Sequence, residues 1–170
     1  MSLAIILMGV SGCGKTTVGK SFSKDTGWLF YDGDDFHPPE NVAKMAAGLP
    51  LDDRDRLPWL KNLHQLIQDH LSNNLSVILA CSALKKSYRD ILQGDEGYPV
   101  KFVYLRGSFD LIYQRMTARE DHYMKPEMLR SQFAALEEPE RALIVDAAEP
   151  VGEIITQIKN SLKFSGENDS

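Results

Sequence analysis

A glycine-rich stretch near the N-terminus has the residue types and spacing that bind phosphate. Residues 9–16 read Gly-Val-Ser-Gly-Cys-Gly-Lys-Thr and match the pattern G-x-x-x-x-G-K-[ST] at every fixed position. Such glycines let backbone N–H groups turn toward phosphate oxygens, and the helix that follows adds the positive end of its dipole. Lys15 would neutralise the β- and γ-phosphates during catalysis, and the Thr16 hydroxyl would ligate Mg²⁺. The nucleotide-binding residues expected here are Gly9, Val10, Ser11, Gly12, Cys13, Gly14, Lys15, Thr16 and Thr17.

The rest of the chain narrows the class of phosphate-binding protein. The D-x-x-G and N-K-x-D motifs of GTPases do not occur in it. The apolar segment Val77–Cys81 runs into Ser82 rather than into the Asp that motor ATPases carry at a strand end. The remaining class is the small kinases that use ATP and Mg²⁺.

Acidic residues supply the base that a kinase needs. Asp32-Gly33-Asp34 follows the apolar segment Trp28–Tyr31, which we expect to form a strand next to the first strand. Its carboxyl end would then face the ligand crevice of an α/β sheet. On an extended chain the two carboxylates point the same way, with Asp34 as the base and Asp32 on the Mg²⁺ side. The alternative is a turn with solvated carboxylates. His37 is interpreted equally well as a substrate hydrogen-bond partner or as a turn residue.

Basic residues in two later segments would suit an anionic acceptor. In residues 48–60, Arg54 or Arg56 would hold a carboxylate through a bidentate fork, and the other would pair with the nearby aspartates. We assign Arg54 to the substrate, although charge alone does not separate the two. Lys85 and Arg89 are four residues apart, so a helix would place them on one face toward the acceptor. The alternative for this pair is a solvent-facing basic turn.

A further pair of arginines predicts a lid over the transferred phosphoryl group. Arg115 and Arg119 share a helix face, and we expect a mobile lid at about residues 115–128. Arg115 is assigned to the nucleotide and Arg119 to catalysis, where it would stabilise the transferred charge. His122 is interpreted as a local contact or cap.

Short apolar segments that alternate with amphipathic ones must position these residues. This alternation predicts a parallel α/β sheet with right-handed crossovers. The expected strands are Ala4–Met8, Trp28–Tyr31, Val77–Cys81, Lys101–Leu105 and Ala142–Val145. The expected helices are Lys15–Lys24, Pro58–Leu71, Lys85–Leu92, Phe109–Met116, Pro126–Leu136 and Gly152–Leu162.

The composition of the chain limits the number of domains and the kinds of partner that it can have. The 170 residues fit a single domain, residues 1–163, with a disordered tail at 164–170. The net charge of −5 lies wholly after residue 136, since the chain up to that point holds 16 basic and 16 acidic residues. No basic face for nucleic acid and no membrane segment are indicated. The two cysteines and the lack of a signal sequence favour a reducing, cytoplasmic location.

Several of these segments together resemble the gluconokinase family of small P-loop kinases. The resemblance covers about residues 4–162, and its more specific parts are residues 48–59 and 82–85. Further matching segments are residues 9–16, 32–37, 88–89, 119 with 122–124, 131–133 and 136–139. Two positions depart from the usual family pattern: Asp121, where glycine is more common, and Cys13, where serine is more common. Neither change removes a proposed role.

The resemblance implies a function and a fold. It implies ATP-dependent phosphorylation of the 6-hydroxyl of D-gluconate to 6-phospho-D-gluconate. The implied fold is of the nucleoside-monophosphate-kinase type, with three layers, a five-stranded parallel sheet and often a homodimer. One alternative is a shikimate kinase, although those carry a glycine triplet where this chain has Cys81-Ser82-Ala83. Another is a regulator that binds ATP without catalysis.

Overall fold

The computed structural model describes residues 2–118 and 126–166, which build a five-stranded parallel sheet between two layers of helices. The strand order is β2-β3-β1-β4-β5, with every neighbouring pair parallel. The strands are β1 (Ala4–Met8), β2 (Leu29–Asp32), β3 (Val77–Ala80), β4 (Val100–Arg106) and β5 (Leu143–Asp146). The predicted α/β class and the five-stranded parallel sheet are confirmed.

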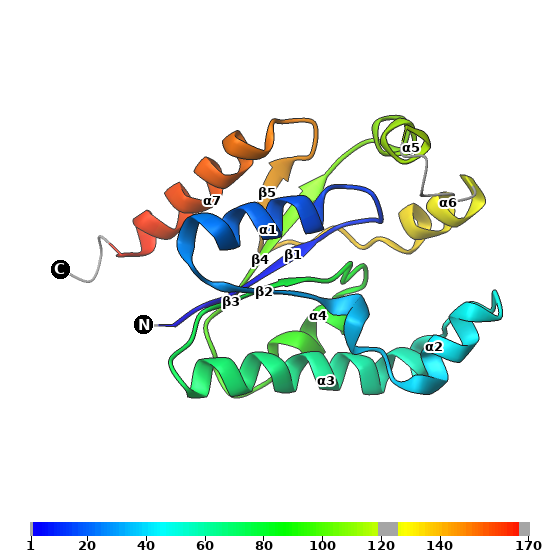
Figure 1. The fold of residues 1–170 in the computed structure, drawn as a ribbon, viewed down its shortest axis with the longest axis horizontal. Coiled ribbons are helices and arrows are strands. Elements are labelled where there is room, and N and C mark those ends of the chain that lie inside the picture. The colour runs from blue at the N-terminus through cyan, green and yellow to red at the C-terminus, as the bar shows by residue number, and fades with distance from the viewer. Residues whose placement is uncertain (1, 119–125, 167–170) are drawn as a thin grey trace.

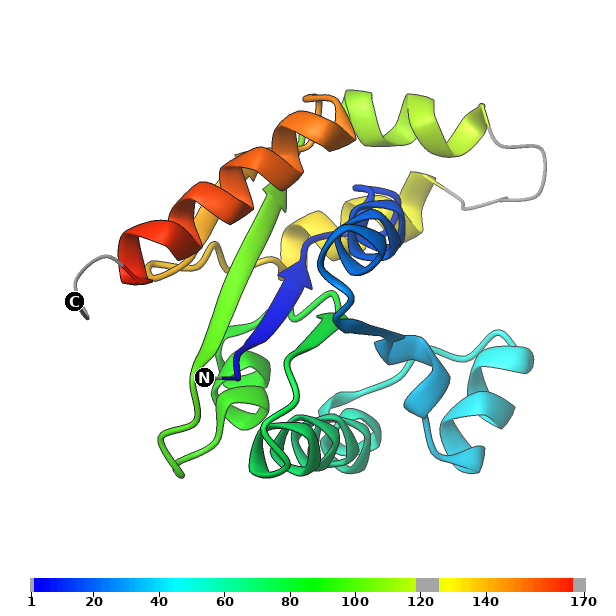
Figure 2. The same ribbon diagram turned by 60° about the vertical axis from the view of Figure 1, so that its left-hand side comes forward.

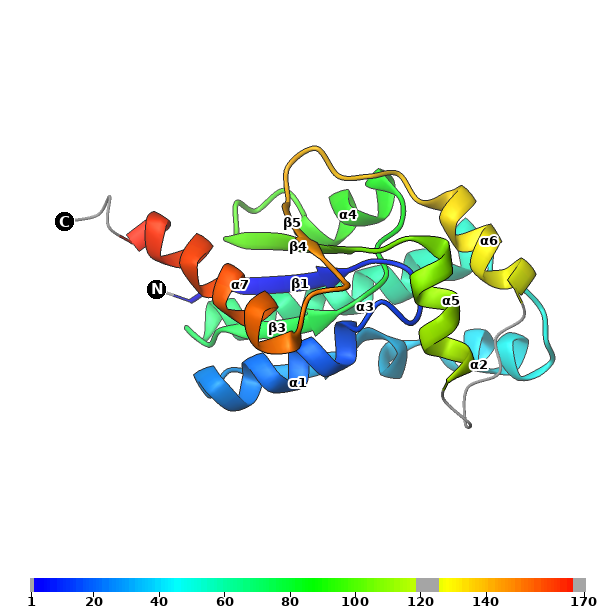
Figure 3. The same ribbon diagram turned by 90° about the horizontal axis from the view of Figure 1, so that it is seen from above.

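Helices cover both faces of the sheet (Figure 1). One face carries α1 (Lys15–Thr26) and α7 (Val151–Gly166), and the other carries α3 (Asp53–Ser72) and α4 (Lys86–Gln93). Beyond the carboxyl ends of the strands lie α2 (Pro39–Ala46), α5 (Phe109–Thr117) and α6 (Pro126–Ala135), at the end of the molecule opposite the termini (Figure 3). The ligand-binding edge of the sheet is therefore framed by α2, α5 and α6.

The core consists of two apolar layers, one on each side of the sheet. Successive β1 side chains alternate between the layers: Ile5 and Leu7 pack toward α1 and α7, while Ile6 and Met8 pack toward α3. All five residues of β1 are buried, which is why this strand has no polar face. Figure 2 shows β1 running through the middle of the molecule toward the loop that precedes α1.

Two features of the arrangement differ from the prediction. The second strand does not lie next to the first, because β3 is inserted between β1 and β2. Helix α2 was not predicted at all, because it has only eight residues, although Val42, Met45 and Ala46 recur at helical spacing and Pro39 suits a helix start.

Two helix boundaries differ from the prediction by more than two residues. Helix α3 begins at Asp53 rather than at Pro58, because Asp52 and Asp55 form a reciprocal capping box. Pro58 therefore lies inside the helix, as its sixth residue, where it cannot donate the hydrogen bond that the carbonyl oxygen of Arg54 would otherwise accept. Helix α7 continues to Gly166 and so includes the first residues of the predicted tail, since extending a formed helix adds a hydrogen bond per residue.

Helices long and apolar enough to cross a lipid bilayer are absent from the part of the chain that the structure describes.

Candidate active site

The loop between β1 and α1 has a backbone that only glycine accommodates at several points. Gly9, Gly12 and Gly14 have φ angles of 143°, 83° and 107°, in the region that L side chains rarely adopt. A Cβ atom at Gly9 would also lie 2.9 Å from the carbonyl oxygen of Leu105. The glycines of the motif thus serve the path of the backbone, as its spacing predicts.

Lys15 and the strand ends line one cavity. The Lys15 ammonium donates hydrogen bonds to the carbonyl oxygens of Gly9 and Val10, at 2.8 and 3.0 Å, so it lies over its own loop. The cavity has a volume of about 260 Å³. Its lining residues are Ser11, Gly12, Gly14, Lys15, Thr16, Thr17, Asp32, Asp34, Ala80, Cys81 and Ser82. The structure therefore brings the phosphate loop and both predicted carboxylates together.

The two aspartates reach this cavity by a route different from the predicted one. The chain does not stay extended after Asp32 but turns into a short 3₁₀ helix, Gly33–Phe36 (η1), that Asp32 caps by accepting a 3.0 Å hydrogen bond from the N–H of Asp34. Gly33 passes so close to β3 that a Cβ atom there would lie 2.7 Å from the carbonyl oxygen of Ala80. This close approach carries the acidic segment from the neighbouring β2 over the end of β3, to the phosphate loop.

The surroundings of Asp34 favour its protonated form. Partial burial in the cavity wall, and then the charge of Asp32, raise the pKa of the Asp34 carboxyl above its ordinary value, while His37 and Lys15 oppose the shift. The residue nonetheless has an exposed surface, so the carboxylate lies inside a concave wall with one side open. A carboxylate with a raised pKa is a better proton acceptor than an ordinary aspartate.

His37 lies between this cavity and α3. Its imidazole stacks on the Trp59 ring, with centroids 4.3 Å apart and planes 15° apart. The Trp59 indole N–H donates a 2.8 Å hydrogen bond to the carbonyl oxygen of Gly33. Trp59 thus supports both the histidine and the turn that carries Asp34.

A cluster of charged side chains surrounds Tyr88. The Tyr88 hydroxyl donates to Asp53, and Arg56 donates to the same hydroxyl at 3.2 Å. Lys85 and Arg56 each approach the Tyr88 ring with 5.6 Å between their charged groups and the ring centroid. The hydrogen bond from Tyr88 lowers the pKa of the Asp53 carboxyl. Arg54 lies on the exposed side of the same helical turn. The charged run is therefore an ordered polar network rather than a solvated loop.

Arg89 does not share a face with Lys85, contrary to the prediction. Lys85 is the residue before α4 and points toward Asp53, whereas Arg89 is 7% exposed and lies inside. The Arg89 guanidinium donates to the carbonyl oxygens of Ala83 and Glu137, at 2.7 and 2.8 Å. Ala83 has a φ of 47°, an uncommon conformation for a residue with a Cβ atom. Arg89 thus braces a strained turn that precedes Lys85.

The predicted lid is described only in part. Arg115 lies at the end of α5 and lines a second cavity, of about 160 Å³, with Gly12, Gly14 and Thr17. Arg119 and His122 lie outside the described residues. Helix α6 contacts the phosphate loop through Gln132, whose amide accepts from the Ser11 N–H at 2.7 Å and donates to the Ser11 hydroxyl at 3.0 Å.

Some residues of the site were not predicted. Ala147, Glu149 and Val151 follow β5 and line the cavity that holds Arg115. Asn41 on α2 contacts His37 and is one of two buried polar or charged residues among those described, the other being Arg89. The burial of Asn41 marks it only once the fold is known, since Asn41 belongs to no recognisable motif.

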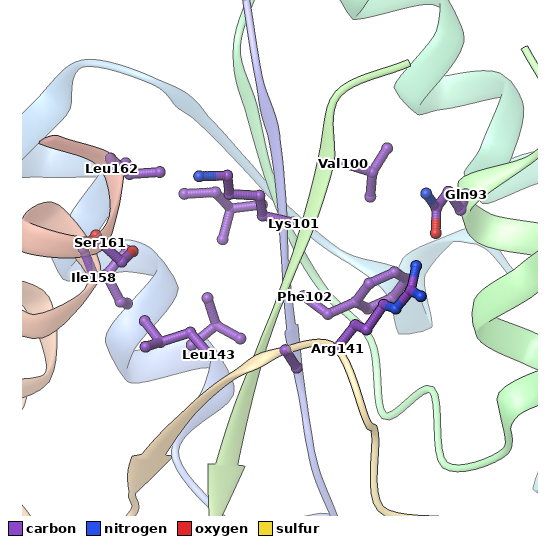
Figure 4. A pocket seen from close by; sticks show the side chains of 12 residues that line it. Gln93, Val100, Lys101, Phe102, Arg141, Leu143, Ile158, Ser161 and Leu162 are labelled. Atoms are coloured by element: carbon purple, nitrogen blue, oxygen red, sulfur yellow. Dashed lines mark hydrogen bonds between the residues drawn. The ribbon is translucent and has the colours of Figure 1, made fainter. Parts of the chain in front are cut away.

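A larger cavity lies elsewhere and holds none of these residues. Its volume is about 410 Å³. It lies along the part of β4 that precedes the pairing with β5, near Phe102, Arg141 and Leu162 (Figure 4). Its lining comes from the amino ends of the strands, from α7 and from Gln93 of α4. Cavity size therefore does not locate the chemistry, whereas the clustering of the motif residues does.

Comparison with known proteins identifies the family of the chain. The model of the shikimate kinase family matches residues 11–163. A probable gluconokinase of Mus musculus is 44% identical over 178 residues, covering 94% of this chain and 97% of that protein. The thermoresistant gluconokinase of Escherichia coli K12 is 41% identical over 163 residues, covering 93% and 92%.

Two solved structures show the difference between a likeness that indicates the family and one that indicates the fold alone. A gluconokinase from Sinorhizobium meliloti 1021 superimposes with a TM-score of 0.84 at 40% identity, covering 98% of this chain and 94% of that one. A shikimate kinase from Bacteroides thetaiotaomicron reaches 0.68 at 17% identity and shares the fold alone. The chain therefore carries a shikimate kinase family domain and belongs, within that family, to the gluconokinases, kinases that phosphorylate an alcohol group.

Proposed function

We propose that this protein transfers the γ-phosphoryl group of ATP to the 6-hydroxyl of D-gluconate, giving ADP and 6-phospho-D-gluconate. The observation that carries the proposal is the shared cavity, in which the phosphate loop with Lys15 faces Asp34. The names of the similar proteins supply the acceptor. The site thus has a phosphate end and a proton-accepting end within one small space.

Asp34 is the proposed base. It would accept the proton of the 6-hydroxyl as that oxygen bonds to the γ-phosphorus, while the bond between the γ-phosphorus and the β–γ bridging oxygen breaks and ADP leaves. Lys15 would neutralise charge on the β- and γ-phosphates, and the N–H groups of the glycine loop would hold them. The lid arginines Arg115 and Arg119 would add positive charge over the transferred group.

The protein offers two oxygen ligands for a Mg²⁺ ion that the nucleotide would hold with most of its other ligands. The Thr16 hydroxyl and the Asp32 carboxylate line the same cavity, and both are hard oxygen ligands. Among the described residues no group of three or more His, Cys, Asp or Glu side chains is arranged to hold a metal ion. Two protein oxygens suit Mg²⁺, which usually keeps waters and phosphate oxygens as its other ligands. When bound, it would neutralise phosphate charge.

The acceptor would lie between η1, α3 and the turn before α4. His37 and Lys85 border this space, and Lys85 would hold the carboxylate. Of the two candidate arginines, the half-buried Arg56 is better placed than the exposed Arg54, because it faces both His37 and Tyr88. Arg89 would act indirectly, by holding the Ala83 turn. The homodimer and the cytoplasmic location stay predictions.

One assay tests the proposal against its alternatives. ADP release is measured in a coupled assay with ATP and Mg²⁺ and with D-gluconate, shikimate or no acceptor. We expect D-gluconate to stimulate ADP release and shikimate to leave it at the rate without acceptor. Stimulation by shikimate alone would point to a shikimate kinase, and ATP binding without any stimulation would point to a regulator; either result would contradict the proposal.

A further inference from the structure

The hydrogen bonds around His37 define which of its ring nitrogens carries a proton. The side-chain amide nitrogen of Asn41 lies 2.8 Å from the backbone carbonyl oxygen of Asp55 and 3.2 Å from Nδ1 of His37. A carbonyl oxygen can only accept a hydrogen bond, so the Asn41 atom that faces it must be the NH₂ group. This contact fixes the orientation of the amide independently of the histidine.

The second hydrogen of the same NH₂ group points toward His37. A donor needs a lone pair opposite it, so Nδ1 must be unprotonated and the proton of the neutral ring must sit on Nε2. A protonated imidazole would place its Nδ1–H against the Asn41 hydrogens. Because Asn41 is only 3% exposed and sits on α2, it has little room to rotate away.

The surroundings of the ring favour its neutral form on balance and leave Nε2 open. One ring face is covered by Trp59. The charged groups that face His37 are Asp34 from η1 and Arg56 from α3. Burial, and to a smaller extent Arg56, lower the pKa of His37, while Asp34 opposes the shift. Among the described residues, Nε2 has no hydrogen-bond partner, so it remains for a ligand.

We propose that Asn41 is a positioning residue that holds His37 as its neutral Nε2–H tautomer, so that His37 acts on the acceptor only as a hydrogen-bond donor. The partner of Nε2–H is an oxygen of the acceptor that offers a lone pair, as a hydroxyl or carboxylate oxygen does. His37 has no free lone pair and so does not compete with Asp34 as the base. The inference rests on the proposed function only in naming the acceptor.

The tautomer is measured directly on the free protein. Long-range ¹H–¹⁵N correlation spectra of the histidine rings at neutral pH, with His37 assigned by comparison with the spectrum of His37→Gln, show which nitrogen is protonated. We expect the pattern of a protonated Nε2 and an unprotonated Nδ1. A ring protonated on Nδ1, or on both nitrogens, would overturn the proposal. This result does not depend on gluconate, so it stands apart from a failure of the proposed function.

Two variants with an amide in place of the imidazole, His37→Gln and His37→Asn, test in kinetic assays whether Nε2 donates a hydrogen bond to the acceptor. The amide nitrogen of a glutamine reaches the position of Nε2, whereas that of an asparagine reaches only the position of Nδ1. We expect His37→Asn to have a KM for gluconate about three- to tenfold higher than that of His37→Gln, with equal KM values for ATP, because one neutral hydrogen bond separates them. Equal KM values for gluconate in the two variants would contradict the donor role.

Asn41→Asp tests the positioning residue itself. A carboxylate in place of the amide would accept a hydrogen bond from a protonated Nδ1, so the pKa of His37 should rise and the KM for gluconate should become dependent on pH near neutrality. His64→Asn, a substitution on a histidine that instead contacts Leu92 and Glu96, is the matched control and should leave that KM unchanged. An unchanged His37 tautomer and pKa in folded Asn41→Asp, checked by circular dichroism, would refute the role of Asn41.

Discussion

The two halves of the active site are built in different ways. The proposed nucleotide side is one continuous loop, residues 9–16, in which Lys15 contacts carbonyl oxygens only five and six residues away. The acceptor side is assembled from separate segments, and its side chains are held by contacts such as Tyr88 to Asp53 and Arg89 to Glu137, 35 and 48 residues apart. The first half depends on local backbone conformation, whereas the second depends on the whole fold.

This difference predicts that substitutions on the acceptor side can disturb the acceptor while leaving the nucleotide in place. The two halves meet at two points. Asp34 faces Lys15 across the shared cavity, and Gln132 joins α6 to Ser11. Substitutions at and away from these points therefore test how separate the halves are.

The largest effect is expected for Asp34→Asn. The amide has the size of the carboxylate but does not accept the proton of the hydroxyl, so kcat should fall by about 10²- to 10⁴-fold. The affinity for ATP, measured by calorimetry in the presence of Mg²⁺, should change by less than about threefold, since other groups hold the phosphates. A loss of ATP affinity as large as the loss of kcat would mean that Asp34 serves the metal, and the assignment of Asp32 and Asp34 would be reversed.

Arg89→Met is expected to have the next largest effect. It leaves the carbonyl oxygens of Ala83 and Glu137 without their donors, and unfolding by urea should show a loss of about 2–4 kcal/mol in the free energy of unfolding. The Ala83 turn should relax and displace Lys85, so the KM for gluconate should rise about tenfold while the KM for ATP stays within about twofold.

Arg54→Met is the control for the loss of an arginine, because Arg54 is on the same side of the molecule but exposed. Its free energy of unfolding should change by less than about 0.5 kcal/mol. If Arg89→Met raised the KM for ATP as much as that for gluconate, the acceptor side could not be treated as a separate unit.

Gln132→Leu tests the point where the halves are joined. Leucine keeps the volume but removes both hydrogen bonds to Ser11, at a cost of about 1–2 kcal/mol in the free energy of unfolding. Because Ser11 belongs to the nucleotide loop and α6 leads to the acceptor side, KM should rise about threefold for both ATP and gluconate. Ser131→Ala, on the exposed neighbour in α6, is the control. A rise for one substrate only would show that α6 serves one half.

The same difference explains what the sequence predicted. The phosphate loop, all five strands and six of the helices follow from local patterns, and the structure confirms these elements with boundary shifts. The strand order does not follow from local patterns. The residues of β2 would suit a position beside β1 as well as a position beyond β3, so its composition does not distinguish the two. The prediction that Lys85 and Arg89 share a face was wrong because it depended on where α4 begins, and a shift of one residue moves Lys85 off the helix.

For the acceptor side, the sequence predicted which types of residue take part but not how they are arranged. Asp34 and His37 stood out beside a complete phosphate loop, and the structure brings Asp34 into the cavity by a turn that the sequence did not indicate. Asn41 carries no motif, and its role depends on Asp55 from a different helix. The left-handed conformation of Ala83 is set by Arg89, which contacts it from within the fold. Such side-chain relations between distant segments leave no local pattern in a single sequence.

The smallest effect expected is a gain in stability from Asp34→Asn, the substitution that should also lower kcat. The pKa of Asp34 is raised in the folded state, so the folded protein binds this proton more tightly than the unfolded chain does. Stability is therefore lost as the pH rises from the ordinary value of 3.8 through the folded pKa. Asp34→Asn removes the charge and should melt at a higher temperature than the wild type at neutral pH, without nucleotide.

This gain should shrink as the pH falls, because the wild-type carboxyl then becomes neutral as well. Asp35→Asn removes a charge that contributes less to the raised pKa of Asp34, so its gain in stability should be smaller than that of Asp34→Asn. An Asp34→Asn protein no more stable than the wild type at neutral pH would contradict the raised pKa. The same raised pKa places the acid limb of kcat/KM for gluconate above the pH at which an ordinary aspartate titrates. The charged form of Asp34 thus costs stability, because the fold holds it partly buried beside a second carboxylate.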